Sequence, residues 1–333
     1  MISRKTYITQ HSKLGATPKL WHWIFLAPVF IPRQPNFKFW VKKNQNFLRQ
    51  VRAVSLSEDL TLNVDSLPQI EILSVAAGKD LEFLGFALKN AIKYSKNEVV
   101  KISIICPKND LKLCQELISS ENFQCEVVIV DEEKEIDESI RIQLKQRFNN
   151  RYGWVLQQLL AVNFVMNSNA KGILLLNADT VMLREVQWLD FESNQILMAS
   201  VEYHEPYYAF LHKTLRFAPD PKYTFITHHM LFQPPIYKSI LEKKDITSIE
   251  SLARLLIEES DPTEDSPFCI EFEPYAQGML EYFLRYVRLR KFSNLSILRT
   301  KENISNIHRV IDNDLRWDYN SVSFHDYLTN DRS

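Results

Sequence analysis

The stretch Gly172-Ile-Leu-Leu-Leu-Asn-Ala-Asp-Thr-Val-Met-Leu183 carries the strongest structural signal in this chain, because an aliphatic run ends in two polar residues. Side chains alternate across a β-strand, so Asn177 and Asp179 point to one side while Ala178 points to the other. Their oxygen atoms then converge, and hard divalent cations such as Mn²⁺ or Mg²⁺ prefer oxygen ligands. Taken alone, the triplet more often marks a strand end that is closed by turn residues.

The residues before this stretch alternate as they do in α/β proteins. Short apolar runs predict strands over 70–76, 99–106, 125–130 and 173–176. Apolar residues at helical spacing predict helices over 80–94, 112–119 and 153–166. Strands that alternate with helices form parallel crossovers, so the sequence predicts a mostly parallel central sheet flanked by helices. The triplet then lies at the carboxyl end of the fourth strand, where ligands of such sheets bind.

Composition excludes several classes of protein. The 333 residues are 45% hydrophobic and 24% charged, which is typical of a globular chain. A formal net charge of −1, with lysine and arginine spread along the chain, gives no basic surface for nucleic acid. The four cysteines lack the spacing of zinc sites or disulfide frameworks, which favours a reducing cytoplasm.

Glycine content argues against the common phosphate-binding loops. Only six glycines occur, and none of them forms the Gly-x-Gly pattern of dinucleotide-binding or Walker-type loops. Kinase and dehydrogenase functions therefore lose support. A diphosphate site that uses carboxylate and metal needs no such glycines.

An apolar segment lies near the N-terminus, at residues 20–31 (LWHWIFLAPVFI). Twelve residues are too few to span a bilayer, and no small-residue cleavage site follows, so we expect no secretion. We favour a strand or loop packed on the main domain. The alternative is peripheral contact with the inner face of the cell membrane through Trp21, Trp23 and Phe25.

Five segments in this order resemble a group of bacterial glycosyltransferase-like proteins, several of which are associated with capsule or lipopolysaccharide sugar genes. The segments are Asp80-Leu-Glu82, Gly153-Trp-Val-Leu-Gln157-Gln158, Leu175-Leu-Asn177-Ala-Asp179-Thr180, Thr227-His228-His229-Met230 and Glu271-Phe-Glu273. The resemblance covers residues 70–327. It implies a GT-A-like (Rossmann-like) fold with a metal clamp of the Asp-x-Asp type.

The same resemblance implies an organisation of the chain. Residues 1–65 are expected to be an N-terminal extension, residues 66–200 the nucleotide-sugar-binding α/β half, and residues 201–333 the acceptor-binding half with a C-terminal tail. The chain departs from the family pattern at three places. Asn177 stands where the clamp usually opens with aspartate, Ala161 and Val162 replace a usual lysine, and Ala276 replaces a glycine.

Donor-binding candidates come from the sheet edge and from the helix that leads to it. Asp80 follows the first strand and could accept a hydrogen bond from the nucleotide base or ribose, or could cap the next helix. Arg151, Gln157 and Gln158 open the helix before the clamp and could reach phosphate or sugar hydroxyls. Asn177 and Asp179 complete this set.

Catalytic candidates lie in two later segments. His228 and His229 are adjacent in an extended segment, so one can line a pocket while the other packs or hydrogen-bonds within the protein. Glu271 and Glu273 alternate around Phe272, which would place both carboxylates on one side if the segment is extended. One could bind acceptor hydroxyls and the other could act as general base. We favour Glu273 as the base, with competing candidates Glu205 and Glu202.

Metal ligands are predicted at the clamp and near the C-terminus. Asp179 is the direct ligand, assisted by Asn177, whose amide oxygen still offers a donor atom. His325 is the predicted third ligand because imidazole suits manganese-like ions, although a surface histidine is the alternative. Trp317 and Tyr319 could stack on the sugar or base, or pack the tail onto the domain.

These features predict a cytoplasmic, Mn²⁺- or Mg²⁺-dependent glycosyltransferase of the hexosyltransferase type. Its donor would be a nucleotide-diphosphate sugar, and its acceptor a glycan or lipid-linked molecule in surface polysaccharide synthesis. Two alternatives remain. One is a catalytically weak sugar-nucleotide or glycan-binding protein of the same fold, and the other is a membrane-associated scaffold that has no donor site.

Overall fold

A computed structural model describes residues 67–200, 202–219, 223–261, 264, 266–300 and 319–325. The predictions for the N-terminal extension, with Trp21, Trp23 and Phe25, and for Trp317 lie outside these residues. The main sheet has five strands in the order β3-β2-β1-β4-β7. Its strands are β1 (Ile70–Val75), β2 (Val99–Cys106), β3 (Glu126–Asp131), β4 (Ile173–Leu176) and β7 (His229–Phe232). All pairings are parallel except that of β4 with β7.

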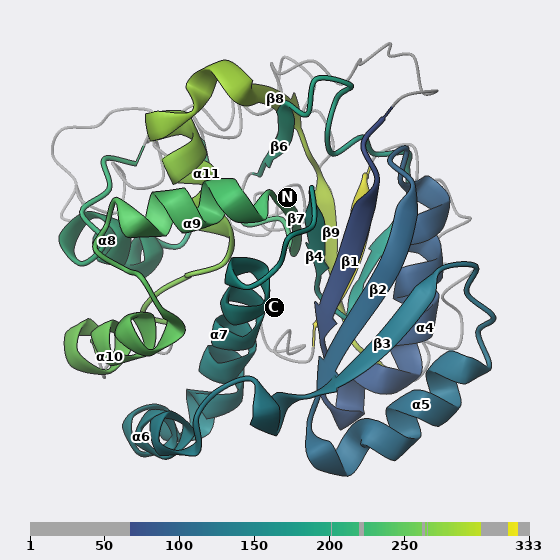
Figure 1. Cartoon of the computed structure of the whole chain (residues 1–333), viewed down its shortest axis with the longest axis horizontal. Coiled ribbons are helices and arrows are strands. Elements are labelled where there is room, and N and C mark those ends of the chain that lie inside the picture. The colour runs from purple at the N-terminus through teal and green to yellow at the C-terminus, as the bar shows by residue number, and fades with distance from the viewer. Residues whose placement is uncertain are drawn as a thin grey trace, which may run out of the picture.

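Helices cover both faces of this sheet, as Figure 1 shows. The helices α4 (Gly78–Tyr94) and α5 (Leu111–Ser119) pack on one face. The other face is covered by α7 (Tyr152–Met166), α9 (Pro234–Glu242) and α11 (Phe272–Tyr282), with α6 (Glu138–Phe148), α8 (Glu205–Lys213) and α10 (Ile249–Glu259) outside them. Alternation along β1 explains the two layers: Ile72 joins the core under α4, and Leu73 joins the core under α7. The predicted α/β architecture is confirmed.

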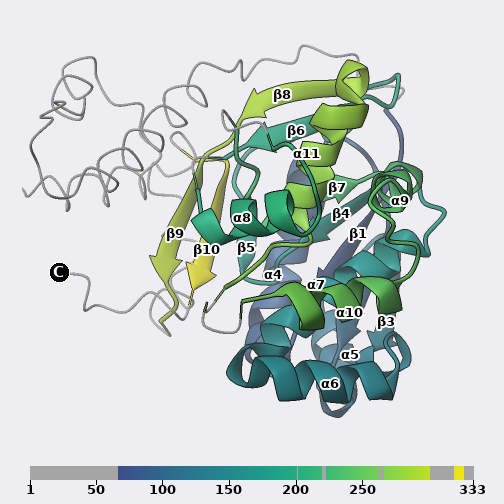
Figure 2. The same cartoon turned by 90° about the vertical axis from the view of Figure 1, so that its left-hand side faces the viewer.

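Two smaller sheets lie beside the main one (Figure 2). The first joins β5 (Thr180–Met182), β10 (Ser321–His325) and β9 (Asn294–Leu298), and the second joins β6 (Gln195–Ala199) and β8 (Val287–Lys291). Short 3₁₀ turns occupy Lys108–Asp110, Glu132–Lys134, Asn149–Arg151 and Leu284–Tyr286. Because β10 pairs with β5, directly after the triplet, it returns the end of the described chain to the edge of the main sheet. Strands on both sides of residue 200 therefore pair, while the predicted two-half organisation stays a prediction.

The segment Glu271-Phe-Glu273 is not extended, because helix α11 begins at Phe272, so the condition for placing both carboxylates on one side is not met. The alternation of acidic and aromatic residues resembles a strand, but Pro274 fits the first turn of a helix, where its missing N–H has no helical partner to lose. Helical geometry turns the two carboxyl groups away from each other. The tertiary environment of each must therefore be considered by itself.

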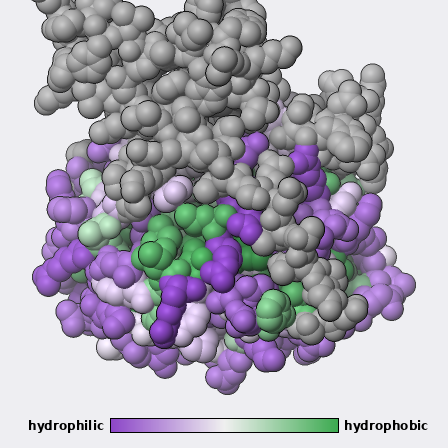
Figure 3. Space-filling view, turned by 90° about the horizontal axis from the view of Figure 1, so that it is seen from above, coloured by the Kyte–Doolittle hydropathy of each residue, from purple (hydrophilic) through white to green (hydrophobic). Residues whose placement is uncertain are grey.

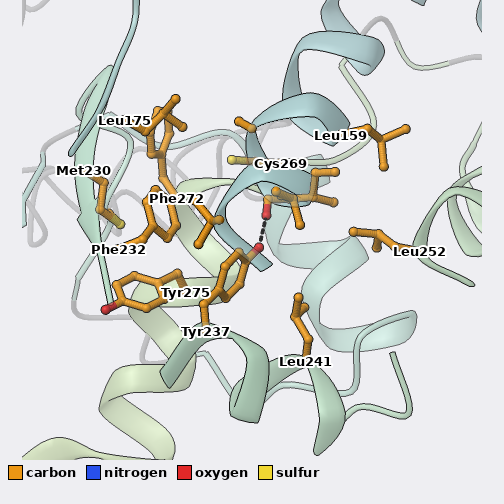
Figure 4. Packing of buried hydrophobic residues seen from close by; sticks show 14 of the residues in the cluster. Leu159, Leu175, Met230, Phe232, Tyr237, Leu241, Leu252, Cys269, Phe272 and Tyr275 are labelled. Atoms are coloured by element: carbon orange, nitrogen blue, oxygen red, sulfur yellow. Dashed lines mark hydrogen bonds between the residues drawn. The ribbon is translucent and has the colours of Figure 1, made fainter. Parts of the chain in front are cut away.

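The core under α7 joins side chains from several helices and from the sheet, as the close view in Figure 4 shows. Phe232 from β7 packs against the rings of Tyr237 from α9 and Tyr275 from α11, and Leu175 from β4 belongs to the same cluster. The two tyrosine rings are edge-on at 5.4 Å between centroids. The Tyr237 hydroxyl donates to the carbonyl of Ile270 at 2.5 Å, so a buried polar group is satisfied where α11 begins.

Helix α11 lies so close to α9 that its glycine is required. A Cβ built on Gly278 would lie 2.5 Å from Cγ2 of Ile240. We expect Gly278→Ala to lower the free energy of unfolding by about 1–3 kcal/mol, because overpacking outweighs the better helix propensity of alanine. Gly153→Ala is the matched control: nothing lies within 4 Å of its Cβ, and we expect a gain of about 0.5–1 kcal/mol. Urea titration measures both, and a Gly278→Ala protein as stable as the wild type would contradict this packing.

The surface of the described residues mixes polar and apolar areas. Figure 3 shows hydrophobic side chains gathered on the face seen from above, bordered by hydrophilic ones. Among the helices that the structure describes, none is long and apolar enough to cross a membrane.

Candidate functional site

The Asn-Ala-Asp triplet forms the turn between β4 and β5, at the carboxyl end of β4. The Asn177 amide donates to the carbonyl of His228 at 3.0 Å, and the Phe324 amide donates to the carbonyl of Asp179 at 3.0 Å. The hydroxyl groups of Thr180 and Ser323 lie 2.8 Å apart. Three segments far apart in the sequence therefore hold this turn in place.

Asp179 and His325 meet at this turn although 146 positions separate them. Oδ2 of Asp179 lies 3.2 Å from Nδ1 of His325, and its other oxygen accepts from the Thr180 hydroxyl at 3.3 Å. Burial raises the pKa of Asp179, but the hydrogen bond and charge of His325, helped by His228, outweigh burial and hold the pKa below its usual value. The carboxylate is therefore ionised at neutral pH, and its side chain remains 23% exposed.

A second carboxylate–imidazole pair lies beside the first. Nε2 of His228 is 3.4 Å from Oε2 of Glu202, and the rings of His228 and His325 are 4.8 Å apart between centroids. Burial lowers the pKa of His228, but the carboxylates of Glu202, Asp179 and Glu271 outweigh burial and raise it. His228 also has a left-handed backbone, with φ of 61°, which is uncommon for a residue with a side chain. The surrounding contacts hold this ring toward the site.

His229 does not belong to this group. It is fully buried, and its ring packs edge-on against Trp188 at 5.3 Å and against Phe292 at 4.5 Å. Burial, with a smaller contribution from the charge of His228, lowers its pKa to about 3, so the ring is neutral. The two adjacent histidines thus differ in surroundings, one facing the charged groups and one packing in the interior.

Glu271 and Glu273 lie in different environments. Glu271 precedes α11 and is buried, and no described group hydrogen-bonds to its Oε1. Burial raises its pKa to about 8, against a smaller opposing effect of His228.

Glu273 is fully buried, and its Oε1 accepts hydrogen bonds from the Tyr208 hydroxyl and the Phe225 amide, each at 2.6 Å. Its Oε2 accepts from Gln277 at 3.2 Å. Glu273 therefore faces the protein interior rather than a site for substrate.

Asp80 lies in the first turn of α4, just past β1, but Ala77 and not Asp80 occupies the capping position. Its carboxylate accepts a hydrogen bond from the guanidinium of Arg299, which follows β9 and also donates to the carbonyl of Lys79. The Arg299 amide donates to the carbonyl of His325 at 3.1 Å. Sequence reasoning missed Arg299, although the apolar alternation in residues 294–298 could have indicated a strand that ends beside it.

The residues predicted at the start of α7 have three different surroundings. Arg151 donates to the hydroxyl of Ser266 at 2.9 Å and stacks over Trp154 at 4.7 Å. Gln158 is buried, and its side-chain oxygen accepts from the Ile270 amide at 2.9 Å, so it ties α7 to the start of α11. Gln157 remains partly exposed. Among the other candidates, Glu205 starts α8 and accepts from the Tyr203 hydroxyl at 3.2 Å, and Tyr319 is fully buried.

The predicted metal ligands can be tested against these contacts. Among the described residues, no group of three or more histidine, cysteine, aspartate and glutamate side chains could hold a metal ion. Asp179 and His325 are, however, 3.2 Å apart, about the separation of two neighbouring ligands of one ion. The Oδ1 atom of Asn177 is buried, and it has no hydrogen-bond partner in the described part of the chain. One carboxylate, one imidazole and one amide oxygen fit an ion that also takes ligands from its substrate.

A separate cleft of about 500 Å³ lies elsewhere on the molecule. It is lined by Glu71, Lys101, Glu135, Phe164 and residues 167–170. Glu71 is near the start of β1, so this cleft is at the opposite end of the strands from Asp179. It does not contribute to the candidate site.

No family model and no curated protein matches this sequence. The chain is similar to the solved structure of mouse xyloside xylosyltransferase 1, with 14% identity, a TM-score of 0.42, and coverage of 77% of this chain and 97% of that chain. It is similar to the mannosyltransferase Ktr4p from S. cerevisiae in complex with GDP, with 12% identity, a TM-score of 0.46, and coverage of 79% and 81%. For LgtC in complex with donor and acceptor sugar analogs, the identity is 12%, the TM-score 0.39, and the coverage 76% and 86%.

Proposed function

We propose that this protein is a glycosyltransferase that uses a nucleotide-diphosphate sugar as donor. The contact between Asp179 and His325 at the carboxyl end of β4 is the observation that supports it most. This edge is where open parallel sheets bind nucleotides, and the contact places an ionised carboxylate and an imidazole there. The order of the motifs, which resembles bacterial glycosyltransferase-like proteins, supports the same function. It also supports a glycan or lipid-linked acceptor in surface polysaccharide synthesis.

Several residues would hold the donor. Asp80, in the first turn of α4, would accept a hydrogen bond from the base or ribose, and Arg151 and Gln157 at the start of α7 would reach phosphate or sugar hydroxyls. Asp179, Asn177 and His325 would hold a Mn²⁺ or Mg²⁺ ion. When bound, this ion would neutralise the charge of the departing diphosphate. Gln158 is not included, because its side chain already bonds to the Ile270 amide.

The acceptor hydroxyl needs a proton acceptor, and Glu202 fits this role best among the carboxylates considered. Its side chain is 48% exposed and lies beside His228. Partial burial raises the pKa of Glu202, but the ion-pair contact with His228 at 3.4 Å outweighs it and holds the pKa below its usual value, so the carboxylate is ionised. We propose that Glu202 takes the proton while His228 orients the carboxylate. Glu273, which the sequence favoured, already accepts three hydrogen bonds in the interior.

A thermal-shift screen of nucleotide sugars tests this proposal. A ligand that binds only the folded protein stabilises it by about 2.7 kcal/mol at a hundred times its Kd. We expect at least one nucleotide sugar to raise the Tm, and to do so more with Mn²⁺ than with a chelator. The same compound should then be hydrolysed slowly without acceptor. If no nucleotide sugar raises the Tm with or without Mn²⁺, the proposed donor site is wrong.

A catalytically weak sugar-nucleotide-binding protein is the second candidate function, and Asn177 favours it. An amide in place of the usual carboxylate removes one negative charge from the metal site. This alternative predicts the same Mn²⁺-dependent rise in Tm without hydrolysis or transfer to any acceptor. Donor turnover, measured as nucleoside diphosphate release, separates the two functions.

A further inference from the structure

Arg299 connects two parts of the candidate site that lie 219 positions apart in the sequence. Its guanidinium donates to the Asp80 carboxylate and to the carbonyl of Lys79, which fixes the first turn of α4. Its backbone amide donates to the carbonyl of His325. Arg299 therefore connects β10, which carries His325, to the first turn of α4.

The contact between Arg299 and Asp80 is well enclosed. Only 11% of the Arg299 side chain and 19% of the Asp80 side chain are exposed. An ion pair in such a place holds both side chains in one geometry, and a planar guanidinium is suited to fixing the direction of a carboxylate. A freely rotating surface carboxylate would have to be ordered when ligand binds, which lowers affinity.

We propose that Arg299 is a positioning residue for nucleoside recognition, which acts by holding the Asp80 carboxylate toward the base or ribose of the donor. This inference rests on the proposed function. One oxygen of Asp80 accepts from Arg299, and the second oxygen is then fixed as the acceptor for the ligand. In this role Arg299 acts through Asp80 and does not bind the diphosphate.

The charge of Arg299 supports the same role. Burial raises the pKa of Asp80, and the hydrogen bond from Arg299 together with the charges of Lys79 and Arg299 opposes this rise. Without the guanidinium, the largely buried carboxyl group of Asp80 would take up a proton more readily. A protonated carboxyl group is a weaker acceptor for a hydroxyl or imino donor.

Affinities for nucleoside diphosphates and for inorganic pyrophosphate test the proposal in the full-length protein. UDP, GDP, ADP, CDP and dTDP would be titrated with Mn²⁺ by calorimetry, and the tightest would be carried forward beside pyrophosphate. We expect Arg299→Ala to weaken the nucleoside diphosphate about tenfold and to leave pyrophosphate unchanged, because pyrophosphate has no base or ribose. Arg254→Ala, which removes an exposed arginine from α10, should change neither affinity. An equal loss for pyrophosphate would overturn the proposal, since Arg299 would then contact the diphosphate.

A double-mutant cycle separates positioning from an independent contribution. If Arg299 acts through Asp80, the double variant Asp80→Ala with Arg299→Ala should bind the nucleoside diphosphate no more weakly than Asp80→Ala. The charge swap Asp80→Arg with Arg299→Asp should recover Tm but not nucleoside affinity, whereas a merely structural ion pair would recover both. Additive losses, or recovered affinity in the swap, would overturn the proposal.

Failure of the inference can be told from failure of the proposed function. If the wild-type protein binds none of the five nucleoside diphosphates with Mn²⁺, the proposed function is wrong and the inference falls with it. If the wild type binds one of them and Arg299→Ala binds it equally well, only the role of Arg299 is wrong.

Discussion

Asp179→Asn is expected to weaken Mn²⁺-dependent binding of the nucleotide sugar by about 10²–10³-fold and to lower donor turnover by a similar or larger factor. The substitution keeps the size of the side chain and removes its charge. Asp179 is the one ionised carboxylate that we assign to the metal, and it also pairs with His325 at 3.2 Å. An amide oxygen holds a divalent cation far more weakly than a carboxylate does. Calorimetry with and without Mn²⁺ measures the loss.

The fold should survive this change, so the loss can be assigned to the site. The backbone of Asp179 is held by the Phe324 amide, and Thr180 is held by Ser323, and neither contact involves the carboxylate charge. We expect the free energy of unfolding without metal to change by about 1 kcal/mol or less. Asp137→Asn is the matched control: it removes one charge at the exposed start of α6, where asparagine caps the helix as well as aspartate does. Unchanged Mn²⁺-dependent binding by Asp179→Asn would refute the assigned role.

Asn177→Asp should have the opposite effect and strengthen the binding of Mn²⁺. The Oδ1 atom of Asn177 is buried, and a carboxylate there would add a second negative charge beside Asp179. Without metal, two neighbouring carboxylates repel, so we expect a lower Tm. With Mn²⁺, the added charge should strengthen ion binding about tenfold or more and reverse the loss. A protein whose Tm responds to Mn²⁺ no more than that of the wild type would contradict the placement of residue 177 at the ion.

The main sheet and its helices could be predicted because their signals are local. The strand over 99–106 is confirmed at both ends, and the helices predicted from residues 80 and 153 begin at Gly78 and Tyr152. Each element shows its own periodicity in the sequence, so only the end residues shift by one or two positions.

The rest of the site depends on contacts that no local pattern carries. The pairing of β5 with β10 joins segments about 140 positions apart, and the only sequence signal was a late histidine. The contact between Arg299 and Asp80 likewise joins residues that are 219 positions apart in the sequence. The alternation of acidic and aromatic residues in Glu271-Phe-Glu273 is compatible with a strand, but in the folded protein helix α11 begins within this segment. The direction of each glutamate could therefore not be read from spacing.

Glu273→Ala is expected to lower the free energy of unfolding by about 3–5 kcal/mol, the largest effect on stability that we predict. The Tyr208 hydroxyl and the Phe225 amide both donate to Oε1 of Glu273 at 2.6 Å, and both groups would lose their acceptor in the interior. Each buried donor without a partner costs about 1–3 kcal/mol, and the missing side chain leaves a cavity as well. Because natural domains are stable by about 5–15 kcal/mol, this variant approaches the limit of folding. Urea titration followed by circular dichroism measures the change.

Glu273→Gln then separates a structural role from a catalytic one. Its side-chain oxygen can still accept from Tyr208 and Phe225. At the other end the new amide must donate to Gln277, which has to turn over its own amide and give up its bond to the Tyr223 carbonyl. We expect a loss of about 1 kcal/mol in stability and donor turnover within about threefold of the wild type. Glu281→Gln, a partly exposed position on the same helix, should change stability by less than about 1 kcal/mol.

A general base at residue 273 predicts the reverse pattern for Glu273→Gln, because glutamine cannot take up a proton. Transfer would then fall by about 10²–10⁴-fold with little change in stability. Glu202→Gln, by contrast, should lower the rate of transfer with little change in stability. The Glu202 side chain is 48% exposed, so the substitution disturbs little packing while it removes the proposed proton acceptor. The two glutamates are thus distinguished by which quantity changes, the free energy of unfolding for Glu273 and the rate of transfer for Glu202.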